Sequence, residues 1–147
     1  MSKKISFKGQ LPMGEQDRIR LKTMQGKVGY KITKFQLMPA TPGAQSNECI
    51  GQIFSTDQTG NISTAVDFTN SDLLAVHFIK YSDATTSALD SVIIFDNAKI
   101  NQDIFINVTD ARGETNRMNY YVELETMALS DIEATQLTLQ SIRSITS

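Results

Sequence analysis

The sequence predicts a mainly β protein: an antiparallel β-sandwich or jelly-roll-like domain with a short C-terminal α-helix. Short segments of alternating apolar and polar residues recur along the chain, and turn-forming residues separate them. Strands do not alternate with helical segments, which argues against a parallel sheet. The length of 147 residues, with 40% hydrophobic and 20% charged residues, suits one domain spanning 1–147.

The first predicted strand covers residues 17–24, where apolar and basic residues alternate. The following Gln25-Gly26 is a turn signal, so this strand and residues 27–38 are expected to form a hairpin. The alternation changes phase between Ile32 and Phe35, which predicts a bulge. Residues 39–47 contain two prolines and a glycine, and they are expected to form a loop.

Further strands are expected after this loop. They are separated by a turn at 57–61, a polar connector of small residues at 82–91 and a turn at 111–116. The predicted strands lie at 49–55, 73–81, 92–95, 103–108 and 118–129.

The end of the chain carries a helix signal. Ser130 and Glu133 have the spacing of a capping box, in which each side chain bonds an amide of the first turn, so a helix is expected at about 131–143. Its apolar residues Ile132, Leu139 and Ile142 fall on one stripe. We expect this stripe to cover one end or edge of the sheet; the alternative is that it reaches a neighbouring subunit.

Charge is divided unevenly along the chain. The formal net charge is -2, yet residues 1–34 contain nine basic and two acidic residues, a net of +7, which leaves -9 for the remainder. This asymmetry fits a nucleic-acid arm, a complementary contact between subunits, or basic strands lying against acidic neighbours. The basic residues alternate without clustering and few aromatic residues lie among them, which disfavours nucleic-acid binding.

Sequence signatures of catalysis are missing. The chain has no Gly-rich phosphate loop, Gly-x-Ser-x-Gly elbow or His-Glu-x-x-His pair. Cys49 and His77 are the only cysteine and histidine, too few for a zinc framework, and we interpret them as a core thiol and a partly buried structural imidazole. We therefore expect no enzyme, no catalytic residues, no metal and no cofactor.

Other features concern surfaces. Glu123 and Glu125 share a strand face and are interpreted as solvated acids. Tyr120 and Tyr121 are adjacent in a strand, so they point to opposite faces, and Tyr121 can offer an exposed ring to a partner. The N-terminus has no signal-like apolar run, and no stretch is long and apolar enough to span a membrane, so neither secretion nor membrane insertion is expected.

Residues 116–135 and their continuation through 139–143 resemble the ending of small virion-associated proteins in tailed phages of marine bacteria. In that group a Tyr-Tyr-x-Glu-Leu-Glu strand is followed by Leu-Ser-Asp and a short helix that ends in an Ile-Arg pair. This chain has those elements at 120–125, 129–131 and 142–143. The resemblance implies a decoration or cement protein on the capsid exterior, and it brings no catalytic residues.

The same resemblance implies a partner, the major capsid protein, and a virion location after synthesis in the host cytoplasm. Such proteins bridge capsid subunits, and closed symmetry is usual, so we expect a homo-oligomer with a trimer ahead of a dimer. The basic N-terminal third is expected to contact an acidic lattice. The candidate partner-binding residues are Lys3, Lys4, Arg18, Arg20, Lys22 and Tyr121.

Two other classes remain open. A tail-fibre or carbohydrate-binding receptor module would use Tyr30, Tyr81 and Tyr121 as aromatic platforms, and glycan binding would favour it. A small hydrolase would need two acids from separate strands to converge in a cleft.

Overall fold

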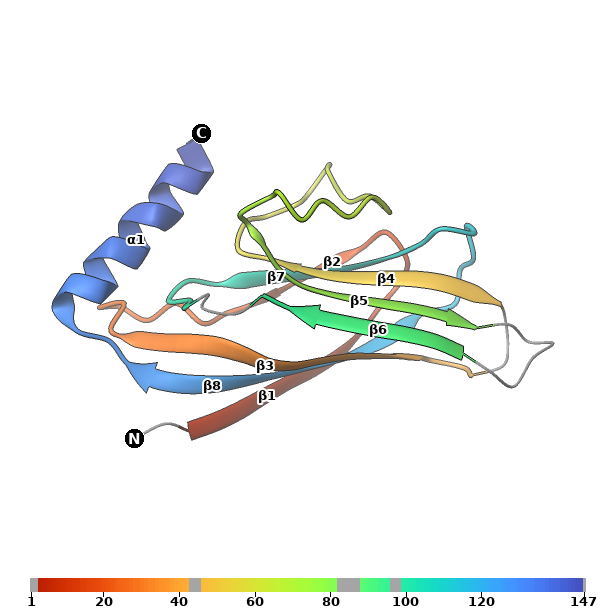
Figure 1. Cartoon of the computed structure of the whole chain (residues 1–147), viewed down its shortest axis with the longest axis horizontal. Helices are drawn as coiled ribbons and strands as arrows, with labels where there is room; N and C mark the ends of the chain where they lie inside the picture. The colour runs from red at the N-terminus through yellow and green to blue at the C-terminus, as the bar shows by residue number, and fades with distance from the viewer. Residues whose placement is uncertain (1–2, 43–45, 82–87, 96–98, 147) are drawn as a thin grey trace.

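The computed structural model describes residues 3–42, 46–81, 88–95 and 99–146. Two antiparallel β-sheets pack against each other, and one helix follows the last strand, which confirms the predicted β-sandwich (Figure 1). The elements are β1 (Lys3–Leu11), β2 (Gln16–Ile19), β3 (Val28–Pro39), β4 (Asn47–Phe54), β5 (Leu73–Tyr81), β6 (Ala88–Ile94), β7 (Ile104–Asp110), β8 (Met118–Ala128) and α1 (Asp131–Thr146).

The strand pairing is nested along the chain. One sheet has the order β1-β8-β3 and the other has the order β2-β7-β4-β5-β6. The pairs β1 with β8, β2 with β7 and β4 with β5 are those of a jelly roll. The remaining nested pair of a jelly roll would join β3 to β6. Here β6 pairs with β5 instead, so β3 is an edge strand of one sheet and β6 is an edge strand of the other.

The core lies between the two sheets, where alternate residues of each strand face inward. Phe35, Ile53, Ile106 and Val122 are 0% exposed there. Fully burying one such side chain contributes about 1.5–3 kcal/mol. The inner faces of the two sheets therefore fix how the strands lie. A second buried cluster, formed by Ile50, Phe54, Leu73 and Val76, lies on the outer side of the five-stranded sheet.

The predicted N-terminal hairpin is wrong. Residues 17–24 do not form one strand, because β2 ends at Ile19 and pairs with β7, whereas β3 pairs with β8 in the other sheet. After β2, the N–H groups of Leu21 and Lys22 donate to Asp103 Oδ1 at 2.8 and 2.9 Å. A side-chain carboxylate thus replaces the strand partner that a hairpin would have supplied.

Strand β1 is absent from the predicted set, although its residues alternate. Leu11 is 3% exposed, and Ile5 and Phe7 are half-buried against the core. The opposite face of β1 carries lysines, so this segment contains few apolar residues and its alternating pattern is weak in the sequence.

The predicted bulge in β3 is confirmed, because the register against β8 shifts between Ile32 and Lys34. The predictions that correspond to β4, β5, β7 and β8 are correct within two residues at each end. The strand predicted at 92–95 instead begins at Ala88, so part of the predicted connector is strand. Residues 82–87 of that connector and 43–45 of the predicted loop lie outside the described residues. The helix ends at Thr146, beyond the predicted end.

Candidate functional site

Helix α1 sits at one end of the sandwich, and its C-terminal half stands clear of both sheets (Figure 1). The predicted capping box is present: the Glu133 N–H donates to Ser130 Oγ at 3.2 Å, and the Ser130 N–H donates to Glu133 Oε1 at 3.4 Å. Lys99 pairs with Glu133 at 2.7 Å, and Lys27 pairs with Asp131 at 3.1 Å. The first turn of the helix is therefore the anchored part.

The face of α1 that docks on the sandwich is small and polar. Ala134 is 5% exposed, and the side chain of Asn101 is almost fully buried beneath it. Asn101 Nδ2 lies 3.1 Å from Gly26 O, 3.3 Å from Ala134 O and 3.2 Å from Thr138 Oγ1. This buried amide ties the helix to the turn before β3, and it fixes which face of α1 turns inward.

The apolar stripe of α1 is largely exposed, with Leu139 lining an open cleft beside the five-stranded sheet, so the expectation that it covers the sheet is wrong. Ile132, Leu139 and Ile142 are 72%, 48% and 52% exposed. A helix can turn only one face to the sandwich, and the hydrogen bonds of Asn101 select the face of Ala134 and Thr138. An exposed stripe of large apolar residues is typical of an interaction surface.

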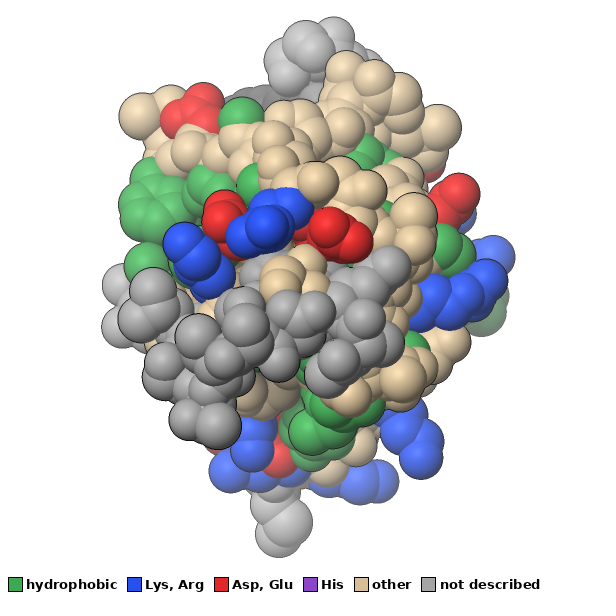
Figure 2. Space-filling model, turned by 90° about the vertical axis from the view of Figure 1, so that its right-hand side faces the viewer, with side chains coloured by type: hydrophobic (Ala, Val, Ile, Leu, Met, Phe, Trp, Pro, Cys, Tyr) green, Lys and Arg blue, Asp and Glu red, His purple; other side chains and the backbone are tan. Residues whose placement is uncertain are grey.

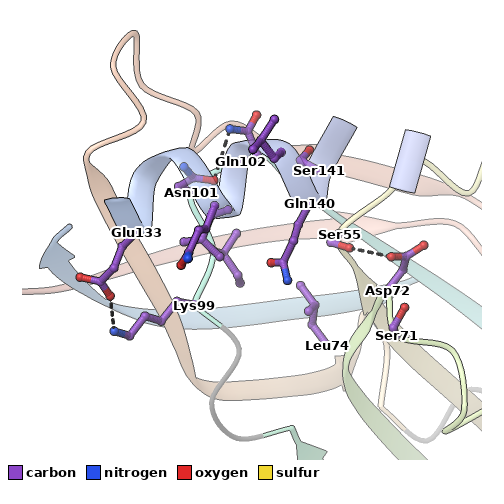
Figure 3. A pocket seen from close by; sticks show the side chains of 14 residues that line it. Ser55, Ser71, Asp72, Leu74, Lys99, Asn101, Gln102, Glu133, Gln140 and Ser141 are labelled. Carbon is purple, nitrogen blue, oxygen red and sulfur yellow. Dashed lines mark hydrogen bonds and ion pairs between the residues drawn. The ribbon is translucent and has the colours of Figure 1, made fainter. Parts of the chain in front are cut away.

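A cleft of about 890 Å³ lies between α1 and the end of the five-stranded sheet. Figure 3 shows that its ionisable groups are engaged by neighbours: Lys99 contacts Glu133, and Asp72 accepts from Ser55 Oγ at 3.4 Å. The hydrogen bond from Lys99, followed by that from the Ser130 N–H, holds the pKa of Glu133 below its ordinary value. The carboxylate of Glu133 therefore remains ionised near neutral pH.

The outer face of the three-stranded sheet carries alternating rows of charge. Glu123 and Glu125 of β8 lie between two basic strands, and in the sheet register both Lys4 and Lys31 stand opposite Glu125. Lys4 Nζ lies 4.0 Å from Glu123 Oε2. Basic side chains also gather along the lower rim of Figure 2, on the side of this sheet. Basic strands therefore lie against an acidic neighbour, as the third interpretation of the charge asymmetry expects.

Tyr121 lies in the middle of this charged face. It stands opposite Lys8 in the register, and Lys34 Nζ lies 5.8 Å from the centre of its ring. The adjacent Tyr120 is 7% exposed on the inner face, which confirms that the two rings point in opposite directions. Burial, and then the hydrogen bond from Tyr120 Oη to Asp17 at 2.8 Å, raise the pKa of Tyr120.

The six predicted contact residues fall in two places. One group lies on the three-stranded sheet, and the other lies on or just after β2 at the edge of the five-stranded sheet. The first group is Lys3, Lys4 and Tyr121, and the second is Arg18, Arg20 and Lys22.

Arg18 is engaged within the molecule. Its Nε and Nη2 atoms each lie 2.7 Å from Asp103 Oδ2, and its guanidinium stands 5.7 Å from the centre of the Phe105 ring. Burial raises the pKa of Asp103, but the N–H groups of Lys22 and Leu21 and the charge of Arg18 outweigh it, so the pKa lies below its ordinary value. Sequence reasoning missed Asp103 because it lies far from Arg18 along the chain.

The single histidine and the single cysteine are both structural. His77 is 0% exposed; its Nδ1 accepts from the Leu37 N–H at 2.9 Å, and its Nε2 donates to Asp90. This imidazole joins β5 to β3 across the sandwich, and it is fully buried where partial burial was expected. Cys49 is 0% exposed, and burial, followed by the charge of Asp110, raises the pKa of its thiol to about 12.

The aromatic platforms expected for a receptor module are only partly available. Tyr30 is 8% exposed, so its predicted role as a platform is wrong. The side chain of Tyr81 lies outside the described part of the chain, and Tyr121 is half-buried beside Lys34.

Within residues 3–42, 46–81, 88–95 and 99–146, no group of three or more His, Cys, Asp or Glu side chains is placed to hold a metal ion. No helix in that part of the chain combines the length and apolar character needed to cross a bilayer. No known family model matches the chain, and no curated protein is significantly similar to it.

Proposed function

We propose that this chain is a non-enzymatic virion structural protein, a capsid decoration or cement protein that bridges major capsid subunits. The observation that carries the proposal is the apolar stripe of α1, where Ile132 and Leu139 are 72% and 48% exposed. The stripe lies on a helix that projects from one end of the sandwich (Figure 1). Burying such a stripe against a neighbouring subunit removes apolar surface from water and stabilises the assembly.

The strand edges supply a second means of attachment. Strand β1 ends the three-stranded sheet, and its nine residues include Lys3, Lys4 and Lys8. Two copies of such a strand repel each other, whereas an acidic extended segment of another protein is attracted to it. This agrees with the proposed contact between the basic N-terminal third and an acidic capsid lattice. Exposed Arg20 and Lys22, near the edge strand β2, extend the basic surface.

The fold gives further support by analogy. Jelly rolls serve in viral capsids as well as in sugar-binding domains, and three of the four nested strand pairs of a jelly roll are present here. Closed symmetry satisfies all equivalent contacts, so a homo-oligomer, with a trimer ahead of a dimer, is the expected form on the capsid surface.

The test is binding of the full chain to purified shells of the phage that encodes it. In the variant Ile132→Ser/Leu139→Ser, loss of the apolar contacts should lower affinity for shells by about a hundredfold. Sedimentation of shells followed by quantification of bound protein measures the effect. Because both positions are exposed, the variant should keep wild-type stability within about 0.5 kcal/mol.

The matched control is Thr135→Ser/Gln136→Ser, which changes two exposed polar positions of the same helix. This control should bind shells as the wild type does. Equal occupancy of shells by wild type and the Ile132→Ser/Leu139→Ser variant would overturn the proposal, as would failure of the wild type to bind shells at all.

A further inference from the structure

A second, smaller cavity lies on the outer face of the five-stranded sheet, beneath the segment that joins β4 to β5. Its volume is about 120 Å³. Gln52 of β4 and Asn107 of β7 form its floor and stand directly opposite each other in the sheet register. The joining segment contributes the rim residues Asn61, Asp67 and Asn70.

The two amide side chains of the floor differ in their hydrogen bonds. Gln52 Nε2 donates to Ser63 O at 3.4 Å and to Ala65 O at 3.2 Å, so this side chain holds the segment over the cavity. Asn107 is 1% exposed, and its Oδ1 accepts no hydrogen bond from any described residue. A buried acceptor of this kind favours any molecule in the cavity that can donate a hydrogen bond to it.

The rim supplies both donors and acceptors. Asn70 Oδ1 accepts from the Asp72 N–H at 2.9 Å, which leaves its Nδ2 group for other bonds. Asp67 Oδ1 accepts from the Thr69 N–H at 2.9 Å and from Thr69 Oγ1, which leaves Oδ2 available. Asn61 is exposed, and its amide offers one further donor and one further acceptor.

The geometry points to a binding site for a neutral polyhydroxylated ligand, the hydroxyl-bearing edge of a single sugar unit. A sugar hydroxyl donates one hydrogen bond and accepts others, so it can donate to Asn107 Oδ1 while accepting from the amides of Asn61 and Asn70. The buried aromatic ring of Phe54 lines the same cavity and offers an apolar wall.

Other ligand classes fit this cavity less well. Asp67 is the only carboxylate among the described residues that line it, whereas a divalent cation prefers several oxygen ligands with more negative charge. No lysine or arginine in the part of the chain that the structure describes lines the cavity, so an anion would find no countercharge from those residues. The small volume of the cavity, about 120 Å³, suits one edge of a single sugar ring better than a longer oligosaccharide.

The test is NMR of the full chain with glucose, galactose, mannose and N-acetylglucosamine, added separately. At least one of these sugars should receive saturation transfer from the protein and shift the side-chain amide resonances of Asn107. Replacing either rim amide, in Asn61→Ala or Asn70→Ala, should weaken that binding about two- to tenfold through loss of one hydrogen bond. The variant Asn107→Ala should abolish it.

The matched control is Asn119→Ala, which removes an amide from the outer face of the other sheet, where Asn119 bonds Gln10 at 3.0 Å. It should leave sugar binding unchanged. Because Asn61 and Asn70 are exposed, their variants test the site even when Asn107→Ala fails to fold. The inference is overturned when no sugar binds, when the rim variants bind as well as wild type, or when calcium alone shifts the Asn107 amide. The rim variants should still bind shells normally, so this site and the proposed function of α1 fail independently.

Discussion

Asp103 offers the sharpest test of how the N-terminal third is held. Its Oδ2 atom receives the Arg18 guanidinium through two contacts of 2.7 Å, and its Oδ1 atom accepts from the N–H groups of Leu21 and Lys22. Residues 20–27 belong to no strand, and this carboxylate ties Leu21 and Lys22 to the residue that precedes β7. The informative changes are Asp103→Ala and Asp103→Asn.

The magnitude follows from the burial of each partner. Leu21 is 3% exposed, so the alanine variant leaves at least one buried N–H without an acceptor, at a cost of about 1–3 kcal/mol. The Arg18 side chain is 51% exposed, so solvent limits its contribution to about 1 kcal/mol. We therefore expect Asp103→Ala to lower the free energy of unfolding by about 3 kcal/mol. Asp103→Asn keeps an acceptor oxygen and should lower it by about 1 kcal/mol.

Urea unfolding followed by circular dichroism measures both values. The control is Glu15→Gln, which removes an exposed carboxylate near the start of β2 and should change stability by less than about 0.5 kcal/mol. If Asp103→Ala costs no more than this control, then Asp103 does not hold residues 20–27 and the reasoning is refuted.

The same carboxylate gives a pH dependence with a defined sign. Because its pKa is lower in the folded state, Asp103 stabilises the fold above its unfolded pKa of about 3.9, and this contribution is lost as the pH falls through the folded-state pKa. The difference in unfolding free energy between wild type and Asp103→Asn should be constant near neutral pH and should shrink in acid. A difference that grows on acidification would contradict this assignment.

Two further predictions concern the core. Gly51→Ala should lower the free energy of unfolding by about 1–3 kcal/mol in a urea titration, because its new Cβ would lie 2.8 Å from Leu37 Cδ1, and an unchanged midpoint would contradict this packing. Cys49, with its pKa raised to about 12, should resist iodoacetamide at pH 8 in the folded protein and react once urea unfolds it, so rapid alkylation without denaturant would show that the thiol is not buried as described.

Local patterns in the sequence predict most of the strands and the start of the helix. The capping box of Ser130 and Glu133 and the phase change in β3 depend on residues close in sequence, and both predictions hold. The false hairpin at Gln25-Gly26 has the opposite cause. Its turn signal is real, because Gly26 has a φ of 64°, yet the flanking segments belong to different sheets. A local turn does not determine which strands pair across the fold.

The candidate surfaces were harder to predict, since long-range polar contacts decide them. The Arg18–Asp103 pair holds a predicted contact residue against another part of the same chain. Asn101 likewise selects the inward face of α1 through Ala134 and Thr138, whereas hydrophobic periodicity alone predicts a face that includes Ile132 and Leu139. In both cases a side chain distant in sequence satisfies polar groups that the apolar pattern ignores.

The segment joining β4 to β5 connects the cleft beside α1 with the cavity above Asn107. The two ends of the segment are joined by a hydrogen bond from the Ser55 N–H to Asp72 O at 2.9 Å. Gln16 of β2 also binds the segment: its Nε2 donates to Asp57 Oδ1, and its Oε1 accepts from the Gln58 N–H, both at 2.8 Å. Hydrogen bonds from Gln16 and then Thr59 lower the pKa of Asp57 to about 2, so the carboxylate remains charged near neutral pH. The Ser55–Asp72 bond and the Gln16 bonds hold this segment in place before any ligand binds. A ligand that enters the cavity therefore does not have to order the segment, and little binding free energy is lost in doing so.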